Sequence, residues 1–122
     1  MKLLGIDYGD RHLGLAIADS ETKLASPWQI IGNNFIELKR IITEEKIEKI
    51  VVGRPIGHRG QLAKTKKFLE LLKNNLTLPI DTEDERFSTV MANKLIKGNK
   101  KKGERDDAIS AMLILQSYLD RK

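Results

Sequence analysis

Three acidic residues, far apart in the chain, could together bind a divalent cation: Asp7, Glu85 and Asp107. Asp7 lies within the apolar segment LLGIDYGDRHLGLAIAD, where a carboxylate needs a hydrogen bond, a cation or a metal ion. Carboxylate oxygens suit Mg²⁺, and Mn²⁺ accepts the same ligands. Two such ions about 3.5–4 Å apart can grip a phosphodiester, activating the attacking water and stabilising the leaving oxygen. Converging acids would therefore indicate metal-dependent phosphodiester hydrolysis, and without metal their repulsion should raise their pKa values.

Each of these acids also has a structural interpretation that involves no metal. An aspartate followed closely by a glycine, as Asp7 is by Gly9, is typical of a turn. The acids of EDER, which include Glu85, most often form a solvated strand end. Asp106 and Asp107 can cap the last helix and interact with its dipole, for about 0.3–1 kcal/mol each. The metal site is favoured only because all three acids lie on elements that are expected to meet.

Hydrophobic periodicity and turn residues predict the elements that must position these acids. The predicted strands cover 3–7, 13–19, 24–31, 49–53 and 79–85, and the predicted helices cover 34–46, 61–76, 88–96 and 107–119. Ser88 is the expected N-cap of the third helix, residues 97–105 are expected to be a loop, and Pro27 places its strand near an edge or bulge. A meander of three strands followed by β-α-β crossovers predicts an α/β fold with a mixed five-stranded sheet and helices on both faces. Ligand sites gather at the carboxyl ends of parallel strands, where Asp7 and Glu85 are expected.

Composition limits the class of protein. A chain of 122 residues suits one domain, expected to span residues 1–122. It has no cysteine, no run of apolar residues long enough to span a membrane, and a charged residue too early for a signal peptide. A cytoplasmic location is therefore expected. The net charge of +5 and the isoelectric point of about 9.5 favour a polyanionic partner, nucleic acid first of all.

The basic residues gather in two segments, GRPIGHRGQLAKTKK and KLIKGNKKKGER. The second segment directly precedes Asp107, so it should flank the proposed site, although a lysine run is as often a solvated surface. Gly9 would let a phosphate or backbone approach closely. The residues expected to contact nucleic acid are Gly9, Arg11, Arg54, Arg59, Lys64, Lys100, Lys101 and Lys102. His12 and His58 lie in no motif that requires them and are expected at the surface.

Four segments, in order along nearly the whole chain, carry a resemblance to a known family: GIDYGDRHLGLAIAD, IVVGRPIGHRGQ, DERFSTVMA and DDAISAMLILQSYLD. Through them the chain resembles the YqgF/RuvX family of Holliday-junction-resolvase-like proteins, also described as pre-16S rRNA nucleases. The resemblance implies a ribonuclease H-like fold, a nuclease that uses Mg²⁺ or Mn²⁺, and trimming of the 5′ end of precursor 16S rRNA. It assigns Asp7, Glu85 and Asp107 as catalytic, metal-binding acids, with Asp84 and Asp106 as adjacent rivals.

The resemblance also bears on two neighbouring positions and leaves other functions open. Arg86 matches the family's arginine, as a phosphate contact or an ion-pair partner, and Asp10 stands where the family commonly has threonine, adding negative charge near a phosphate site. Partners would be precursor rRNA and ribosomal particles, or branched DNA for a Holliday-junction-type resolvase. A non-catalytic nucleic-acid-binding assembly factor would need the basic segments but not the acids. An ATPase of the actin and sugar-kinase type shares an aspartate-glycine hairpin but requires two large domains. The oligomeric state is left open by the sequence.

Overall fold

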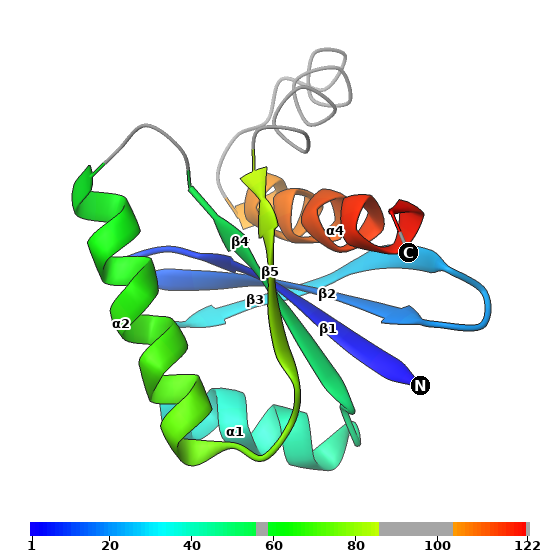
Figure 1. Cartoon of the computed structure of the whole chain (residues 1–122), viewed down its shortest axis with the longest axis horizontal. Helices are drawn as coiled ribbons and strands as arrows, with labels where there is room; N and C mark the ends of the chain where they lie inside the picture. Colours follow the sequence, from blue (N-terminus) through cyan, green and yellow to red (C-terminus); the bar gives the residue numbers. More distant parts are fainter. Residues whose placement is uncertain (56–58, 86–103, 122) are drawn as a thin grey trace.

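The computed structural model describes residues 1–55, 59–85 and 104–121 (Figure 1). The strands in these ranges are β1 (Lys2–Tyr8), β2 (His12–Asp19), β3 (Leu24–Gly32), β4 (Lys49–Arg54) and β5 (Ile80–Asp84). The helices in the same ranges are α1 (Phe35–Glu44), α2 (Arg59–Asn75) and α4 (Glu104–Asp120). None of the described helices is both long and apolar enough to cross a membrane.

The strands form one mixed sheet in the order β3-β2-β1-β4-β5. β1 is antiparallel to β2 and parallel to β4, and β5 continues the sheet parallel to β4. The predicted meander followed by crossovers is therefore confirmed. Pro27 lies on the edge strand β3, where the register shifts opposite Ala16 of β2. This position is also as predicted, because proline has no N–H to donate to a central ladder.

One face of the sheet is covered by α1 and α2 (Figure 1). Apolar residues recur in α1 at helical spacing, and Leu38, Ile41 and Ile42 are buried there. Asn34 begins this helix, because its side chain accepts hydrogen bonds from the N–H groups of Ile36 and Glu37. The sheet contributes alternate residues to the same core: Leu4, Ile6, Leu13, Leu15, Ile50 and Val52.

The opposite face is covered by α4 alone among the described helices (Figure 1). Small residues of the sheet let this helix approach closely. A methyl group on Gly5 would lie 2.8 Å from the Leu115 Cβ atom and 3.0 Å from the Ala111 carbonyl oxygen. The core on this side joins α4 to Leu3, Ala16, Ala18 and Val51. Because α4 lies so near the strands, short side chains from both elements can meet.

The C-terminal helix starts earlier than the sequence predicts. Residues 107–119 were expected to form the last helix with Asp107 at its start, which is wrong, because α4 begins at Glu104. Glu and Arg are good helix formers, so Glu104 and Arg105 extend the helix and leave Asp107 in its first turn rather than at the cap. The helix predicted for 88–96 lies outside the described residues, as does most of the loop predicted for 97–105.

Candidate active site

Strand alternation turns Asp7 toward α4. Side chains on one strand alternate between the two faces of the sheet, so Asp7 shares the α4 face with Leu3 and Gly5. The register partner of Asp7 on β2 is Gly14. A methyl group on Gly14 would overlap the Asp107 carbonyl group and come within 3.0 Å of the Asp107 Cβ atom. Asp107 therefore lies directly against the strand position beside Asp7.

Glu85 reaches the same place from the end of β5. Its Oε1 atom would lie 2.9 Å from a methyl group on Gly53, the β4 residue whose register partner is Glu83. β4 is also the parallel neighbour of β1, so a side chain that lies over Gly53 is directed toward Asp7. The carboxyl groups of Asp7 and Glu85 are joined by a hydrogen bond. The convergence of β1, β5 and α4 thus brings the three predicted acids together.

The environment of Asp7 strongly favours its protonated form. Burial, followed by the hydrogen bond to Glu85 and the charges of Glu85 and Asp107, raises the pKa of Asp7 from 3.8 to about 8. The expectation that mutual repulsion raises a pKa is confirmed for this residue, although burial is the larger cause. At neutral pH Asp7 is therefore mostly protonated and can donate a hydrogen bond to Glu85.

The acids are close together but do not form a preformed metal site. Within the described residues, no three His, Cys, Asp or Glu side chains form a ready-made metal site. Asp7 and Glu85 are hydrogen bonded to each other, whereas Asp107 acts on Asp7 through its charge. A proton on Asp7 removes its charge and so its repulsion with Glu85 and Asp107. The donor set fits a hard divalent cation, since all three groups supply carboxylate oxygens.

The two rival acids are not equivalent to the three that converge. Asp84 is buried, but alternation along β5 directs it to the sheet face opposite that of Glu83, which contacts α4. Asp84 is also not among the groups that raise the pKa of Asp7. The side chain of Asp106 lies outside the described residues. Glu85 therefore differs from Asp84 because only Glu85 lies on the face of the sheet that carries Asp7.

Basic residues lie in the turn between β1 and β2 and near it on β4 and α2. Arg11 is exposed in this hairpin, and Arg54 is exposed at the end of β4. The Lys64 Nζ atom lies 3.1 Å from Oδ2 of Asp10, so the extra negative charge of Asp10 is paired with a cation. Gly9 has no room for a side chain, because a methyl group there would lie 2.7 Å from the His12 carbonyl oxygen. The lack of a side chain at Gly9 is thus a requirement of the turn.

Other predicted contacts lie partly or wholly outside the described residues. Arg59 begins α2, but its side chain is not described. The remaining predicted phosphate contacts outside the described residues are Arg86, Lys100, Lys101 and Lys102. His58 is likewise outside them, whereas His12 is exposed, as expected.

Sequence reasoning missed the residues that let the acids meet. Gly14 and Gly53 leave the space that the Asp107 backbone and the Glu85 side chain occupy. It also missed the polar contacts between α4 and β5, which include Ser117 with Glu83. Glycines at alternate positions of apolar strands were the available signal, because such glycines mark close approach of another backbone.

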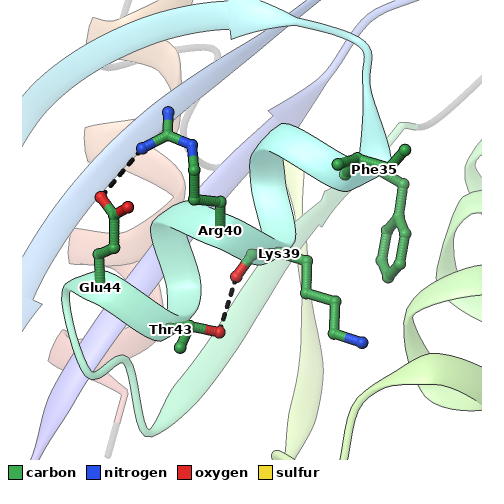
Figure 2. A pocket seen from close by; sticks show the side chains of 6 residues that line it. Phe35, Lys39, Arg40, Thr43 and Glu44 are labelled. Atoms are coloured by element: carbon green, nitrogen blue, oxygen red, sulfur yellow. Dashed lines mark hydrogen bonds and ion pairs between the residues drawn. The ribbon is translucent and has the colours of Figure 1, made fainter.

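A separate cavity lies elsewhere in the molecule. It measures about 500 Å³ and runs along α1, between the side chains shown in Figure 2. Its lining residues are Phe35, Ile36, Lys39, Arg40, Thr43 and Glu44. Arg40 and Glu44 form an ion pair at 2.9 Å there. Since α1 covers the other face of the sheet, this cavity shares no residue with the acid cluster.

The fold and the converging acids define a class of protein. The mixed sheet with a helix across the β1 acid is a ribonuclease H-like fold, shared with solved junction resolvases. T. thermophilus RuvC in complex with a Holliday junction substrate superposes with a TM-score of 0.67 over 99% of this chain and 94% of that chain, at 13% identity. The Fowlpox virus resolvase in complex with substrate Holliday junction DNA gives 0.63 over 99% and 98%, at 16% identity. At these identities the likeness concerns the fold alone.

The chain belongs to the RuvX family. The family model described as "RuvX: Holliday junction resolvase" matches residues 1–121. A Sulfurihydrogenibium protein named "Putative pre-16S rRNA nuclease" is 39% identical, over 98% of this chain and 90% of the relative. A Desulforamulus reducens protein of the same name is 38% identical, over 98% and 97%. The resemblance carried by the four sequence segments is thereby confirmed.

Proposed function

We propose that the chain is a metal-dependent nuclease in which Asp7, Glu85 and Asp107 bind Mg²⁺ or Mn²⁺. One observation supports this most directly: these half-buried acids lie close enough to one another that the pKa of Asp7 rises to about 8. A structural ion pair would lower the pKa of Asp7, whereas burial and the nearby carboxyls of Glu85 and Asp107 raise it. Perturbed carboxyls of this kind are typical of functional sites.

The three acids have distinct parts in this proposal. A bound divalent cation would supply Lewis-acid polarisation of the phosphate and a lower pKa for the attacking water. Asp7 would have to be deprotonated to hold the cation, so its raised pKa would couple metal affinity to pH. Glu85 and Asp107 provide the remaining charge from two separate elements, β5 and α4. Gly14 and Gly53 keep the strands bare where these two acids lie against them.

Nucleic acid is the substrate class that we propose, bound first through its phosphates. Arg11, Arg54 and Lys64 surround the carboxyl ends of β1 and β4 and would neutralise the backbone charge. The described aromatic side chains are at least partly buried, as Tyr8 and Phe68 show with ring centroids 4.8 Å apart. Base stacking by the described residues is therefore minor, and shape rather than sequence would guide recognition.

The particular substrate that we propose is the 5′ end of precursor 16S rRNA. The support is the name shared by full-length relatives at 33–39% identity. Ribosomal particles would then be the physiological partner and the cytoplasm the location. Branched DNA is the second candidate, because the fold is that of proteins solved with Holliday junctions.

A cleavage assay with two substrates tests these proposals. Purified protein is incubated with Mn²⁺ and either precursor 16S rRNA or a four-way DNA junction, each with labelled 5′ ends. Asp7→Asn should abolish cleavage but retain binding, because it removes a metal ligand and leaves the basic surface intact. Asp19→Asn makes the same change in charge at the far end of β2 and should cut normally. Binding without cleavage by the wild type, under any divalent cation, would favour an assembly factor.

The cellular role has its own test. Depletion of the protein should leave small-subunit rRNA with an extended 5′ end, measured by primer extension. Mature ends in depleted cells, together with junction cleavage in vitro, would assign the activity to DNA instead.

A further inference from the structure

A row of polar contacts, called here the polar seam, joins Glu83 and Asp81 of β5 to Ser117, Tyr118 and Arg121 at the end of α4. Residues seven apart share one side of a helix, so Asp107 and Ile114 lie along the same side of α4, and Arg121 directly follows the helix. On β5, alternation presents Asp81, Glu83 and the following Glu85 to this helix. Both Ile114 and Glu85 lie over Gly53, which ties the upper part of the helix side to the end of the strand. Asp107 and Glu85 thus lie at the end of α4 and β5 where the acids meet, and further polar contacts between these two elements follow toward the C-terminal end of α4.

Glu83 is the central member of this row. It is only 4% exposed, although it carries a carboxylate. The Ser117 hydroxyl donates a hydrogen bond of 2.6 Å to its Oε2 atom, and Arg121 Nη1 lies 3.2 Å from both carboxylate oxygens. Charge-assisted hydrogen bonds have narrow geometry, so they fix how far α4 lies from β5 at this level.

Asp81 repeats the pattern one step further along the strand. The Tyr118 hydroxyl donates a 2.5 Å hydrogen bond to Asp81, and Lys49 of β4 lies 3.3 Å from the same carboxylate oxygen. The Lys49 ammonium also lies 5.1 Å from the centre of the Tyr118 ring. Two successive β5 acids therefore bind the last turns of α4.

Stability alone gives little reason for this arrangement. Taking a carboxylate out of water is unfavourable, and apolar residues of similar size often replace buried ion pairs without loss of stability. What apolar packing does not supply is a unique register between the two elements. Here that register decides where Asp107, on α4, lies relative to Glu85, at the end of β5.

We propose that Glu83 and Ser117 are positioning residues, which hold α4 on β5 so that Asp107 meets Asp7 and Glu85 in the geometry that binds metal. This inference rests on the proposed nuclease function and adds to it residues that touch neither metal nor substrate. Partners that bond directly to metal ligands change metal affinity by about 10–100-fold when they are removed, so the lower end of this range is expected for residues that act one contact further away.

The decisive variant is the double substitution Glu83→Leu with Ser117→Ala, which removes both polar partners together. Its melting temperature should stay close to that of the wild type, because the remaining partner of Glu83 is Arg121, whose side chain is 59% exposed and can bond to water instead. Its affinity for Mn²⁺, measured by calorimetry, should fall about tenfold. Amide hydrogen exchange at Asp107–Ala111 should become about tenfold faster, because this part of α4 is less firmly held.

If the double variant does not fold, the single variants Glu83→Gln and Ser117→Ala test the positioning role in its place. Glu83→Gln retains an acceptor for Ser117 and should bind Mn²⁺ almost as the wild type does, whereas Ser117→Ala should lose part of the affinity. Gln116→Ala is the matched control, since Gln116 lies in the same turn but bonds to Ala25 and Lys23 on the β3 side. It should leave both readouts nearly unchanged.

The outcomes separate this inference from the proposed function. Wild-type affinity and exchange in the double variant would overturn the positioning role, as would an equal loss in Gln116→Ala. Absence of Mn²⁺ binding by the wild type would overturn the metal site, while hydrogen exchange would still decide whether the seam holds α4.

Discussion

Neutralising Asp7 should stabilise the metal-free protein at neutral pH. The carboxyl group has an ordinary pKa of 3.8 in the unfolded chain and a pKa of about 8 in the folded one. Between these values the folded protein binds a proton that the unfolded chain releases. The free energy of unfolding therefore falls as the pH rises through this interval.

The size of the effect follows from the same two values. Each pH unit between the two pKa values lowers the free energy of unfolding by about 1.4 kcal/mol. From pH 3.8 to pH 7 the loss is thus on the order of 4 kcal/mol. Asn is neutral at every pH and can still donate a hydrogen bond to Glu85. We expect Asp7→Asn to gain about 2–4 kcal/mol at pH 7 and almost nothing at pH 4.

Urea unfolding followed by circular dichroism measures this difference at pH 4, 5.5, 7 and 8, in the presence of a chelator. Asp19→Asn is the control, because Asp19 is exposed and no pH-dependent gain is expected there. Added Mn²⁺ should reverse the ranking at pH 7, since only the wild type retains all three acids. If Asp7→Asn is less stable than the wild type at pH 7 without metal, or if its gain does not grow with pH, the account of the cluster is wrong.

Three further outcomes follow from the site. Gly14→Ala should lower the free energy of unfolding by about 2–4 kcal/mol, because its methyl group would overlap the Asp107 backbone; Gly32→Ala, where no atom lies within 4 Å, should cost far less in the same urea titration. Lys64→Gln should weaken RNA binding and reduce its salt slope by about 0.7–0.9, measured by filter binding from low to moderate salt; an unchanged slope would show that Lys64 contacts no phosphate. Chelation of divalent cations should abolish cleavage but spare RNA binding, and restoration by Mn²⁺ but not Ca²⁺ would show a requirement for a small octahedral ion.

Much of the secondary structure could be predicted from short-range patterns in the sequence. Apolar residues at helical spacing determined α1, a short wholly apolar run determined β4, and Pro27 marked an edge strand, because each of these effects depends on near neighbours in the chain. The start of α4 was wrong for the complementary reason. Helix ends depend on weak local preferences, and packing of the first turn against Gly14 is not visible in the sequence around Asp107.

The sequence by itself determined which acids could act and which family the chain resembles, since motif residues and their order are properties of the chain. Only the tertiary structure decided that Asp7 is hydrogen bonded to Glu85, that Asp84 faces the other side of the sheet, and that buried Glu83 binds α4. Strand register and helix placement set these relations, and both arise from contacts between residues many positions apart. A carboxylate's pKa likewise depends on burial and on neighbouring charges, which exist only once β1, β5 and α4 have packed together.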